Sequence, residues 1–240
     1  MNLLDALRTT AAIRDFTDRP VDRATVARIL DTARFAPNGG NAQSWRVISV
    51  EDPSTRAQLR DLYLDGWQLY LAQSAAGLRP WAPLTDRDRE AEVIAAARAE
   101  PRVPGTLGDF AEHFDRVPAL LVVAADLRLL AATDRDLGRY TIVGGASVYP
   151  FVWSILLAAR EEGLGGVITT MAVAAEPAVK ALLGVPDEFA LAAVVALGEP
   201  QRQPTKLRRG AVETFATVDR FDGDAIRVDP SPDQPHHPSA

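Results

Sequence analysis

The chain has 240 residues, of which 47% are hydrophobic, so it can form one large domain or two small ones around a sizeable core. It has no cysteine and only three histidines, two of them in a terminal tail rich in Pro, Ser and Asp, which excludes disulfide bonds, thiolate catalysis and Cys/His metal sites. Its net charge of -6 argues against general nucleic-acid binding.

The first elements predicted along the chain are helices on either side of a glycine-rich loop. Leucines at positions 3, 4 and 7 have helical spacing and predict a first helix that ends near Thr10. Asp22 is a good N-cap for a second helix over 23–34, which has one apolar face. The loop over 36–44 and a strand over 45–50 follow, and a third helix is expected from Asp52 through Tyr63.

Between residues 66 and 116 the apolar spacing loosens. The segment contains Trp67, Tyr70 and Trp81, several prolines and a charged helix expected over 86–100. An aromatic-rich segment of this length is typical of a lid or cap beside a binding site. An equal alternative is a surface insertion that packs around a small core of its own. His113 lies near its end and is expected to be structural or to form part of a pocket wall. These three aromatic residues and His113 are the predicted substrate-pocket residues.

The second half of the chain predicts buried strands and helices. Strands are expected over 118–125, 167–170 and 189–197, and a short helix over 177–183. A helix over 144–159 is apolar on nearly every side, which indicates a central position or an interface with a second subunit; a glycine-rich turn over 163–166 ends it. No apolar run is expected to be long enough to cross a bilayer, and the amino terminus lacks the order of a signal peptide. A cytoplasmic location is the default prediction.

The loop over 36–45 is the most informative part of the chain. Gly39 and Gly40 let the backbone approach a ligand closely or adopt conformations that other residues avoid. The side chains of Asn38, Asn41 and Gln43 carry both amide donors and carbonyl acceptors. A flat heterocycle edged with carbonyls and ring nitrogens needs this mixture, whereas a simple turn needs only one such residue.

A few basic residues could hold a phosphate. Arg14 stands alone in a small, neutral segment, and Lys206, Arg208 and Arg209 cluster far away in the sequence. Arg grips a phosphate bidentately and Lys adds a point charge, although a basic cluster is more often a solvated face. The chain has neither a Walker phosphate loop nor a Gly-x-Gly-x-x-Gly segment between a strand and a helix, so a nucleotide would be held in another way.

These residues together resemble the FMN-dependent, nitroreductase-like flavoproteins, over the chain from Leu3 to about Val218. Ile13-Arg14-Asp15-Phe16 followed by Pro20-Val21 is similar to the family's opening Arg-x-Phe and Pro-Val element, and the loop over 36–45 is similar to its Ala-Pro-Ser-x-x-Asn-x-Gln-Pro-Trp signature. Gly163-Leu164-Gly165 and Lys206-x-Arg208 match two later landmarks. Ser44 stands where the family commonly has Pro, and Thr10-Ala11-Ala12 where it has a further basic residue and a Ser.

The resemblance implies an α+β fold with a central, mostly antiparallel sheet flanked by helices, and a homodimer in which the C-terminal segment embraces the partner subunit. It implies FMN as cofactor, with its phosphate paired with Arg14, Lys206 and Arg208. Asn38, Gly39, Gly40, Asn41 and Gln43 would line the ring and the ribityl chain. Ile168, Thr169 and Thr170 would lie beside the flavin, with a backbone N–H directed at the reactive N5.

The predicted function is reduction of nitroaromatics, quinones or similar electron-poor small molecules by ping-pong hydride transfer from NADH or NADPH. No catalytic side chain and no metal are predicted, because the flavin carries the chemistry. The alternatives are a flavin-dependent dehydrogenase of a specialised metabolite or peptide, and a non-catalytic flavin-binding protein. The expected organisation is a single flavin domain over 1–220, with 66–116 as the lid, and a disordered tail over 221–240.

Overall fold

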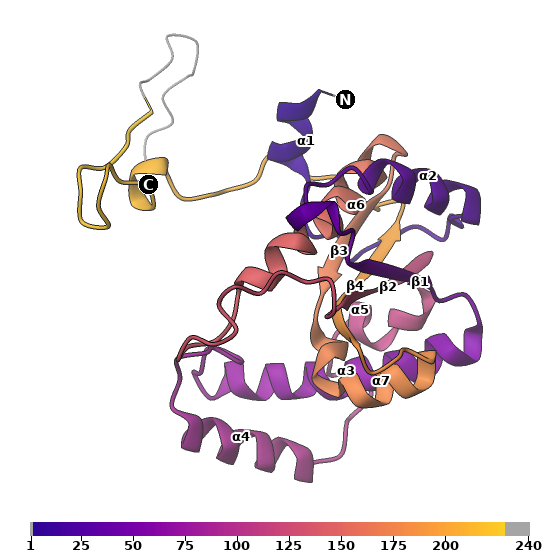
Figure 1. The fold of residues 1–240 in the computed structure, drawn as a ribbon. Coiled ribbons are helices and arrows are strands. Elements are labelled where there is room, and N and C mark those ends of the chain that lie inside the picture. Colours follow the sequence, from indigo (N-terminus) through magenta and orange to yellow (C-terminus); the bar gives the residue numbers. More distant parts are fainter. Residues whose placement is uncertain (1, 229–240) are drawn as a thin grey trace. The chain divides into compact units, whose positions relative to one another are not determined.

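The computed structural model describes residues 2–228 and divides the chain into two compact units, Met1–Thr205 and Lys206–Ala240. The first unit contains the sheet, the α-helices and several short 3₁₀ helices (Figure 1). The single domain predicted over 1–220 would include parts of both units, and it stays a prediction.

The α-helices of the first unit are α1 (Leu3–Thr9), α2 (Arg23–Ala33), α3 (Pro53–Ala75), α4 (Arg87–Ala99), α5 (Asp109–Glu112), α6 (Tyr149–Glu161) and α7 (Glu176–Leu183). The strands are β1 (Trp45–Ser49), β2 (Ala119–Asp126), β3 (Gly165–Thr169) and β4 (Phe189–Gly198). The 3₁₀ helices are η1 (Gly39–Asn41), η2 (Phe114–Arg116), η3 (Val143–Ser147) and η4 (Met171–Ala175). As predicted, Asp22 caps α2, since its carboxylate accepts a hydrogen bond from the Thr25 N–H at 2.7 Å.

The four strands form one antiparallel sheet in the order β1-β2-β4-β3. Every residue of β2 is buried, as is most of β4, because both strands are apolar on both faces and occupy the middle of the sheet. β1 and β3 are the two edge strands. This arrangement confirms the predicted α+β fold with a central antiparallel sheet.

Helices cover both faces of the sheet, and the two faces have separate cores (Figure 1). On one face α2 and α6 pack against alternate strand residues such as Leu121 and Val195. On the other face α3 and α7 pack against the intervening residues, such as Val122 and Val194. The alternation follows from the twofold period of a strand, and it explains why the central strands contain almost no polar side chains.

Helix α6 is buried in the first of these cores. Phe151, Val152 and Ile155 are almost fully buried, which agrees with a central position, one of the two predicted for this segment. Contrary to the sequence prediction, the stretch Val143–Glu161 would satisfy the length and hydropathy of a membrane-crossing helix, with 19 residues and a mean hydropathy of 1.2, and it is the one such stretch within residues 2–228. Half of its window is buried inside the protein, so core packing accounts for its composition.

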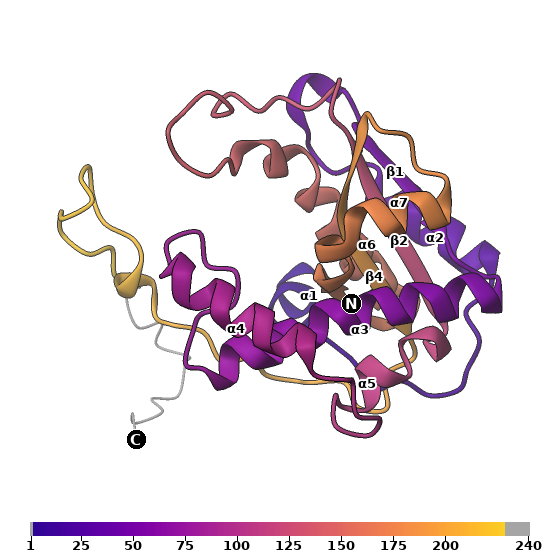
Figure 2. The ribbon, with the colours of Figure 1, turned by 90° about the horizontal axis from the view of Figure 1, so that it is seen from below.

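Helix α3 is longer than the sequence predicts. It does not end near Tyr63 but continues to Ala75, so the first part of the predicted lid is helical and Trp67 and Tyr70 lie on α3. Gly66 lies in its middle because a Cβ there would come within 2.4 Å of the Met171 carbonyl oxygen. The glycine therefore marks a close approach between α3 and η4, where the sequence suggests a break. Figure 2 shows α4 alongside the carboxyl-terminal part of α3.

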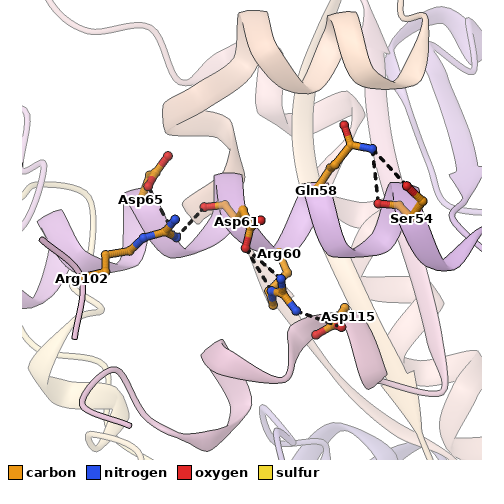
Figure 3. Close-up of polar contacts among 7 residues, drawn as sticks. All are labelled: Ser54, Gln58, Arg60, Asp61, Asp65, Arg102 and Asp115. Carbon is orange, nitrogen blue, oxygen red and sulfur yellow. Dashed lines mark hydrogen bonds and ion pairs between the residues drawn. The ribbon is translucent and has the colours of Figure 1, made fainter. Parts of the chain in front are cut away.

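The chain between α4 and β2 is fixed to the polar face of α3 (Figure 3). Arg102 lies 3.6 Å from the Asp65 carboxylate and donates to the Asp61 carbonyl at 3.1 Å. Arg60 pairs with Asp115 of η2 at 3.1 Å. The predicted lid is thus tied to α3 at two places, Arg102 and Asp115.

The second unit contains a short 3₁₀ helix, Val212–Thr214, and a turn closed by a bridge between Thr217 and Ala225. The Ile226 N–H donates to the Ala216 carbonyl at 3.0 Å. Residues 221–228 of the predicted disordered tail therefore have a defined backbone, whereas 229–240 lie outside the described residues.

Candidate functional site

The segment that carries Arg14 is held between two parts of the sheet. On one side the Ile13 N–H donates to the Gly166 carbonyl of β3 at 2.9 Å. On the other side the Asp15 carbonyl accepts from the Gln201 N–H at 3.0 Å, just after β4. The Arg14 side chain is exposed and, among the described residues, has no hydrogen-bond or ion-pair partner. It is therefore a free cation on a fixed backbone.

Three elements meet where β3 ends. Tyr63 of α3 is only 2% exposed, and its ring stacks on Phe114 at a centroid distance of 4.2 Å. Burial raises the pKa of its hydroxyl, whereas the Thr169 side chain and the positive charge of Arg14 act to lower it. The structure thus gathers Arg14, Thr169 and Tyr63. Tyr63 is not among the sequence-predicted site residues, although a tyrosine on an apolar helix face has a hydroxyl that must find a partner.

The neighbours of Thr169 differ in exposure. Ile168 is half-buried and packs against the core that contains α2 and α6. Thr170 is exposed and directly precedes η4. The predicted trio of Ile168, Thr169 and Thr170 therefore has one half-buried hydroxyl, on Thr169, and one exposed hydroxyl, on Thr170.

The loop before β1 is held mostly by its own hydrogen bonds. The Asn38 side chain accepts from the Gln43 N–H at 2.8 Å and donates to the Ala36 carbonyl at 3.1 Å. The Gly39 N–H donates to the Ser147 hydroxyl of η3 at 3.1 Å. Asn38 is thus occupied in shaping the loop, which leaves less of its amide for a ligand than the sequence suggests.

Three residues of this loop have left-handed backbone conformations. Their φ angles are 59° at Gly40, 52° at Asn41 and 47° at Gln43. Asn tolerates this region and Gln rarely adopts it, so the backbone is strained at Gln43. The side chains of Asn41 and Gln43 are exposed and have no partner among the described residues. Strain and free amide groups together are features of a binding loop.

A second loop, between β2 and η3, lies against Gly39. A Cβ at Gly39 would come within 3.6 Å of the Ala131 side chain. Asp134 is buried and accepts hydrogen bonds from the Ile142 and Val143 N–H groups, which, with a bond from Arg139, keep the pKa of its carboxyl below the usual range. This carboxylate organises the loop that supports Gly39.

The structure does not bring the loop before β1 and the end of β3 together within one chain. β1 and β3 are opposite edge strands, with β2 and β4 between them. Three strand spacings of about 4.8 Å separate the edges by about 14 Å. Lys206 and Arg208 belong to the second unit, and their position relative to Arg14 is not defined. Of the predicted flavin contacts, the structure thus groups only Arg14 with the Ile168–Thr170 segment.

The aromatic residues of the predicted pocket form a continuous row along α3. The Trp67 and Tyr70 rings stack at 5.0 Å, and Tyr70 lies 6.4 Å from Trp81. Trp67 also donates to the Leu107 carbonyl at 2.6 Å. His113 has no contact with this row among the described residues and instead bonds Asp109 at 2.8 Å, one helical turn away. His113 is the C-cap residue of α5 and bonds back to the first residue of that helix, and its predicted role, structural or in a pocket wall, stays a prediction.

The comparisons with known proteins agree with this fold. The sequence profile described as Nitroreductase family matches residues 7–199. The chain is 31% identical to a 5,6-dimethylbenzimidazole synthase of Rhodospirillum rubrum, over 83% of each chain. It is 30% identical to an NADH dehydrogenase of Thermus thermophilus, over 80% of this chain and 83% of that protein.

A solved structure resembles the fold over nearly its whole length. The FMN and NADPH-dependent nitroreductase NfnB from Sphigopyxis sp. strain HMH aligns with a TM-score of 0.61 and 25% identity, over 92% of this chain and all of that one. The predicted family and the predicted fold are both confirmed. The chain belongs to the nitroreductase family.

Proposed function

We propose that the protein is a homodimeric FMN-dependent oxidoreductase that takes a hydride from NADH or NADPH and passes it to an electron-poor small molecule such as a nitroaromatic or a quinone. The observation that carries the proposal is the pairing of the Arg14 segment with β3, the strand that ends at Thr169, in a chain of the nitroreductase family. The two substrates bind in turn, the oxidised nicotinamide leaving before the acceptor enters.

The chemistry of the residues suits FMN. A phosphate monoester needs charged donors, and Arg14 is a cation without a partner in the described chain; Lys206 and Arg208 are proposed to complete the phosphate site. The ring edge needs both donors and acceptors, which the exposed amides of Asn41 and Gln43 and the Thr169 hydroxyl provide. FMN, when bound, supplies hydride transfer, and the protein supplies position and exclusion of water.

The separation of the two candidate regions supports a site shared between subunits. Because the loop before β1 lies at the sheet edge opposite Thr169, we propose that this loop completes the site of the partner subunit. Exposed apolar side chains near the loop, Phe35 and Ile142, suit a dimer interface. In the second unit Phe215 and Phe221 are also exposed, which fits the proposal that this segment embraces the partner.

The row of rings along α3 suits planar acceptors. Trp67, Tyr70 and Trp81 are each half-buried, so one part of each ring packs in the protein and another remains open. A flat, electron-poor acceptor gains from stacking on such rings. Hydride transfer to an electron-poor acceptor needs no acid or base from the protein.

A second candidate is a dehydrogenase dedicated to one metabolite, with oxygen as the final acceptor. It is favoured by the 31% identity to a protein named a synthase rather than a reductase, because relatives with such different names share this fold. The aromatic row would then bind that metabolite. Rapid turnover with NADH and a quinone in the absence of any other substrate would argue against this candidate.

The absorption spectrum of the purified protein, recorded before and after anaerobic addition of NADPH or NADH, tests the main proposal. A yellow protein that bleaches within seconds and regains colour with a quinone is the expected result. A yellow protein that does not bleach would indicate a flavin carrier. A colourless protein that takes up no FMN would contradict the proposal.

Complementation tests the shared site. Arg14→Ala and a loop variant, Asn41→Ala with Gln43→Ala, are each expected to bind FMN weakly. If the loop serves the partner subunit, mixed dimers contain one site with both defects and one intact site, so co-refolding the two variants restores FMN binding. Absence of any restoration, with mixed dimers shown to form, would place both regions in one subunit's site.

A further inference from the structure

We propose that Gln73 is a positioning residue that fixes Trp81 as one wall of the subsite for the flat acceptor, between the row of rings along α3 and helix α4. This inference rests on the proposed function, because it locates the ring of the nitroaromatic or quinone within the same site. Three features of the chain carry it: the end of α3, the backbone of Trp81, and a cavity against α4.

Gln73 holds the chain at the end of α3 with both its backbone and its side chain. Its carbonyl accepts from the Leu78 N–H at 2.9 Å, while the Ser74 carbonyl accepts from the Gly77 N–H at 3.0 Å. These two bonds, with the left-handed φ of 75° at Gly77, form a Schellman motif that reverses the chain after the helix. The Gln73 side chain extends this arrangement, because its Oε1 accepts from the Trp81 N–H at 3.1 Å.

The Gln73 amide is buried, and both of its ends are bonded. The residue is 0% exposed, and its Nε2 donates to the Leu69 carbonyl, one helical turn earlier, at 3.2 Å. Burying an amide lowers stability unless its donor and acceptor groups find partners. Methionine has a similar shape and no amide to satisfy, so packing alone does not explain a glutamine at this position. The bond to the Trp81 N–H does explain it.

The backbone of Trp81 is left-handed, with a φ of 50°. A bulky residue rarely adopts this conformation, and such strain persists only where surrounding contacts hold it, most often at binding sites. The Gln73 side chain provides one of these contacts. The Trp81 ring lies 6.4 Å from Tyr70, which in turn stacks on Trp67 at 5.0 Å. Gln73 therefore sets the place of the last ring in the row.

Trp81 lines an open cavity of about 500 Å³ that lies against one face of α4. The α4 side of this cavity includes Arg87, Ala91, Ile94 and Arg98, whose spacing of four, three and four residues places them on one helix face. Its volume is within the range of about 300 to 1,000 Å³ that small-molecule sites occupy. The indole of Trp81 and the apolar surface of Ile94 suit a flat aromatic ring.

The charges around this cavity suit a ring that has oxygen atoms at its edge. Glu90 also lines the cavity, and its side chain, only 7% exposed, pairs with Arg87 at 2.5 Å, so these two charges balance. Arg98 has no hydrogen-bond or ion-pair partner within residues 2–228. The oxygens of a nitro group or a quinone accept hydrogen bonds, and a free guanidinium is a donor for them.

A double-mutant cycle on the binding of nitrobenzene to the FMN-loaded protein tests the proposal. The variants are Gln73→Met, Trp81→Ala and both together. Equilibrium dialysis without NADH or NADPH gives the dissociation constant of nitrobenzene, and steady-state kinetics with NADPH or NADH give its KM and kcat. Thermal midpoints establish that each variant is folded.

Two further variants serve as comparisons. Gln73→Glu is the conservative variant, because burial favours the protonated acid, which can accept from Trp81 and donate to Leu69 as the amide does. Gln58→Met is the matched control: Gln58 lies on the same helix and its amide also donates to the carbonyl one turn earlier, that of Ser54, at 3.4 Å, but it is exposed (Figure 3).

We expect Gln73→Met and Trp81→Ala each to raise the dissociation constant and the KM of nitrobenzene about three- to tenfold, the effect of one aromatic contact, with kcat within about twofold of wild type. The double variant should bind no more weakly than Trp81→Ala, because Gln73 acts through Trp81. Gln73→Glu and Gln58→Met should bind as the wild type does.

Unchanged affinity in folded Gln73→Met, or full additivity with Trp81→Ala, would overturn the proposal, because Gln73 would then not act through the ring. If Gln73→Met does not fold, Gln73→Asn replaces it, since its shorter side chain withdraws the amide from the Trp81 N–H. A wild-type protein that binds no FMN, or whose FMN neither nicotinamide reduces, would overturn the proposed function as well. Normal reduction by a nicotinamide, with nitrobenzene binding that Trp81→Ala leaves unchanged, would overturn this inference alone.

Discussion

The turn after β3 and the loop before β1 are both predicted to contact the flavin, but the protein builds them in different ways. The turn is fixed by another element, since η4 packs on α3 and the Met171 carbonyl lies against Gly66. The loop is fixed mainly by its own residues, with Asn38 bonded to Gln43 and three left-handed backbone positions in a row of four. One region depends on tertiary packing and the other on local backbone conformation.

This difference has a consequence for how mutations act. A change that disturbs the turn must also disturb the packing of α3, so it should reduce stability and flavin binding together. A change in the loop, which is exposed and contacts little else, should reduce flavin binding with a smaller loss of stability. The four predictions below separate these two behaviours.

Gly66→Ala is expected to have the largest effect, on the turn side. Alanine favours a helix by about 1 kcal/mol over glycine, so an unconstrained site would become more stable. Here the new Cβ would lie 2.4 Å from the Met171 carbonyl oxygen, and we expect a net loss of about 2 to 3 kcal/mol in the free energy of unfolding. Chemical denaturation measures the change in the free energy of unfolding. A gain would mean that helix propensity dominates, and a loss would mean that the close contact with Met171 dominates.

The matched control for Gly66→Ala is Gly138→Ala. No atom lies within 4 Å of a Cβ at Gly138, and its φ is not left-handed. Its stability should change by less than about 0.5 kcal/mol. If Gly66→Ala proved as harmless as Gly138→Ala, the close contact between α3 and η4 would not constrain the residue at position 66.

Arg14→Ala should weaken FMN binding without destabilising the fold. Arg14 has no partner among the described residues, so its removal breaks no internal contact, whereas a lost charge-assisted hydrogen bond to phosphate costs about 2 kcal/mol, or about thirtyfold in the dissociation constant. A titration of apoprotein with FMN measures the change, and wild-type binding should weaken as salt rises. Arg116→Ala, another exposed arginine whose side chain has no partner in the described chain, is the control and should bind FMN normally.

The sequence predicts those parts of the fold that depend on local patterns. The buried strands β2 and β4 follow from uninterrupted apolar runs, and the start of α2 follows from the capping chemistry of Asp22. The full length of α3 is missed because Gly66 and the aromatic residues after it suggest an interruption. The glycine has a tertiary cause, the Met171 carbonyl, which no local pattern reveals.

The candidate site is predicted less completely, for a related reason. Arg14 and Thr169 are recognisable from the resemblance, but Tyr63 is not, because the fold alone brings it near residues more than a hundred positions away. The order of strands in the sheet is also absent from local patterns. Only the structure shows that the loop before β1 and the end of β3 lie at opposite edges, and this observation leads to the proposal of a shared site.

Gly40→Ala tests the loop side of the comparison. A Cβ at Gly40 meets no atom within 4 Å, so the expected cost is conformational: about 1 kcal/mol for a left-handed residue with a side chain. Gly40→Asn should restore most of this loss, because asparagine tolerates the left-handed region. Thermal midpoints and FMN titrations on both variants measure the effect.

The pair also separates backbone conformation from direct contact with the flavin. If Gly40→Asn has normal stability but still loses FMN, the ring lies against this glycine and excludes any side chain. If both variants bind FMN as the wild type does, the loop does not reach the flavin in either subunit.

Acidification is expected to have the smallest effect, on the support of the loop. Hydrogen bonds from the Ile142 and Val143 N–H groups hold the pKa of Asp134 below its unfolded value of about 3.9, so its contribution to stability is complete above that pH and is lost as the pH falls through the lower, folded-state pKa. Asp134→Asn lacks this contribution at every pH. The difference in thermal midpoint between wild type and Asp134→Asn should therefore be constant near neutrality and shrink below about pH 4. Asp136→Asn, with an exposed carboxylate in the same loop, should match the wild type throughout, and a constant difference for Asp134→Asn down to pH 2 would show that the carboxylate charge does not hold the loop against Gly39.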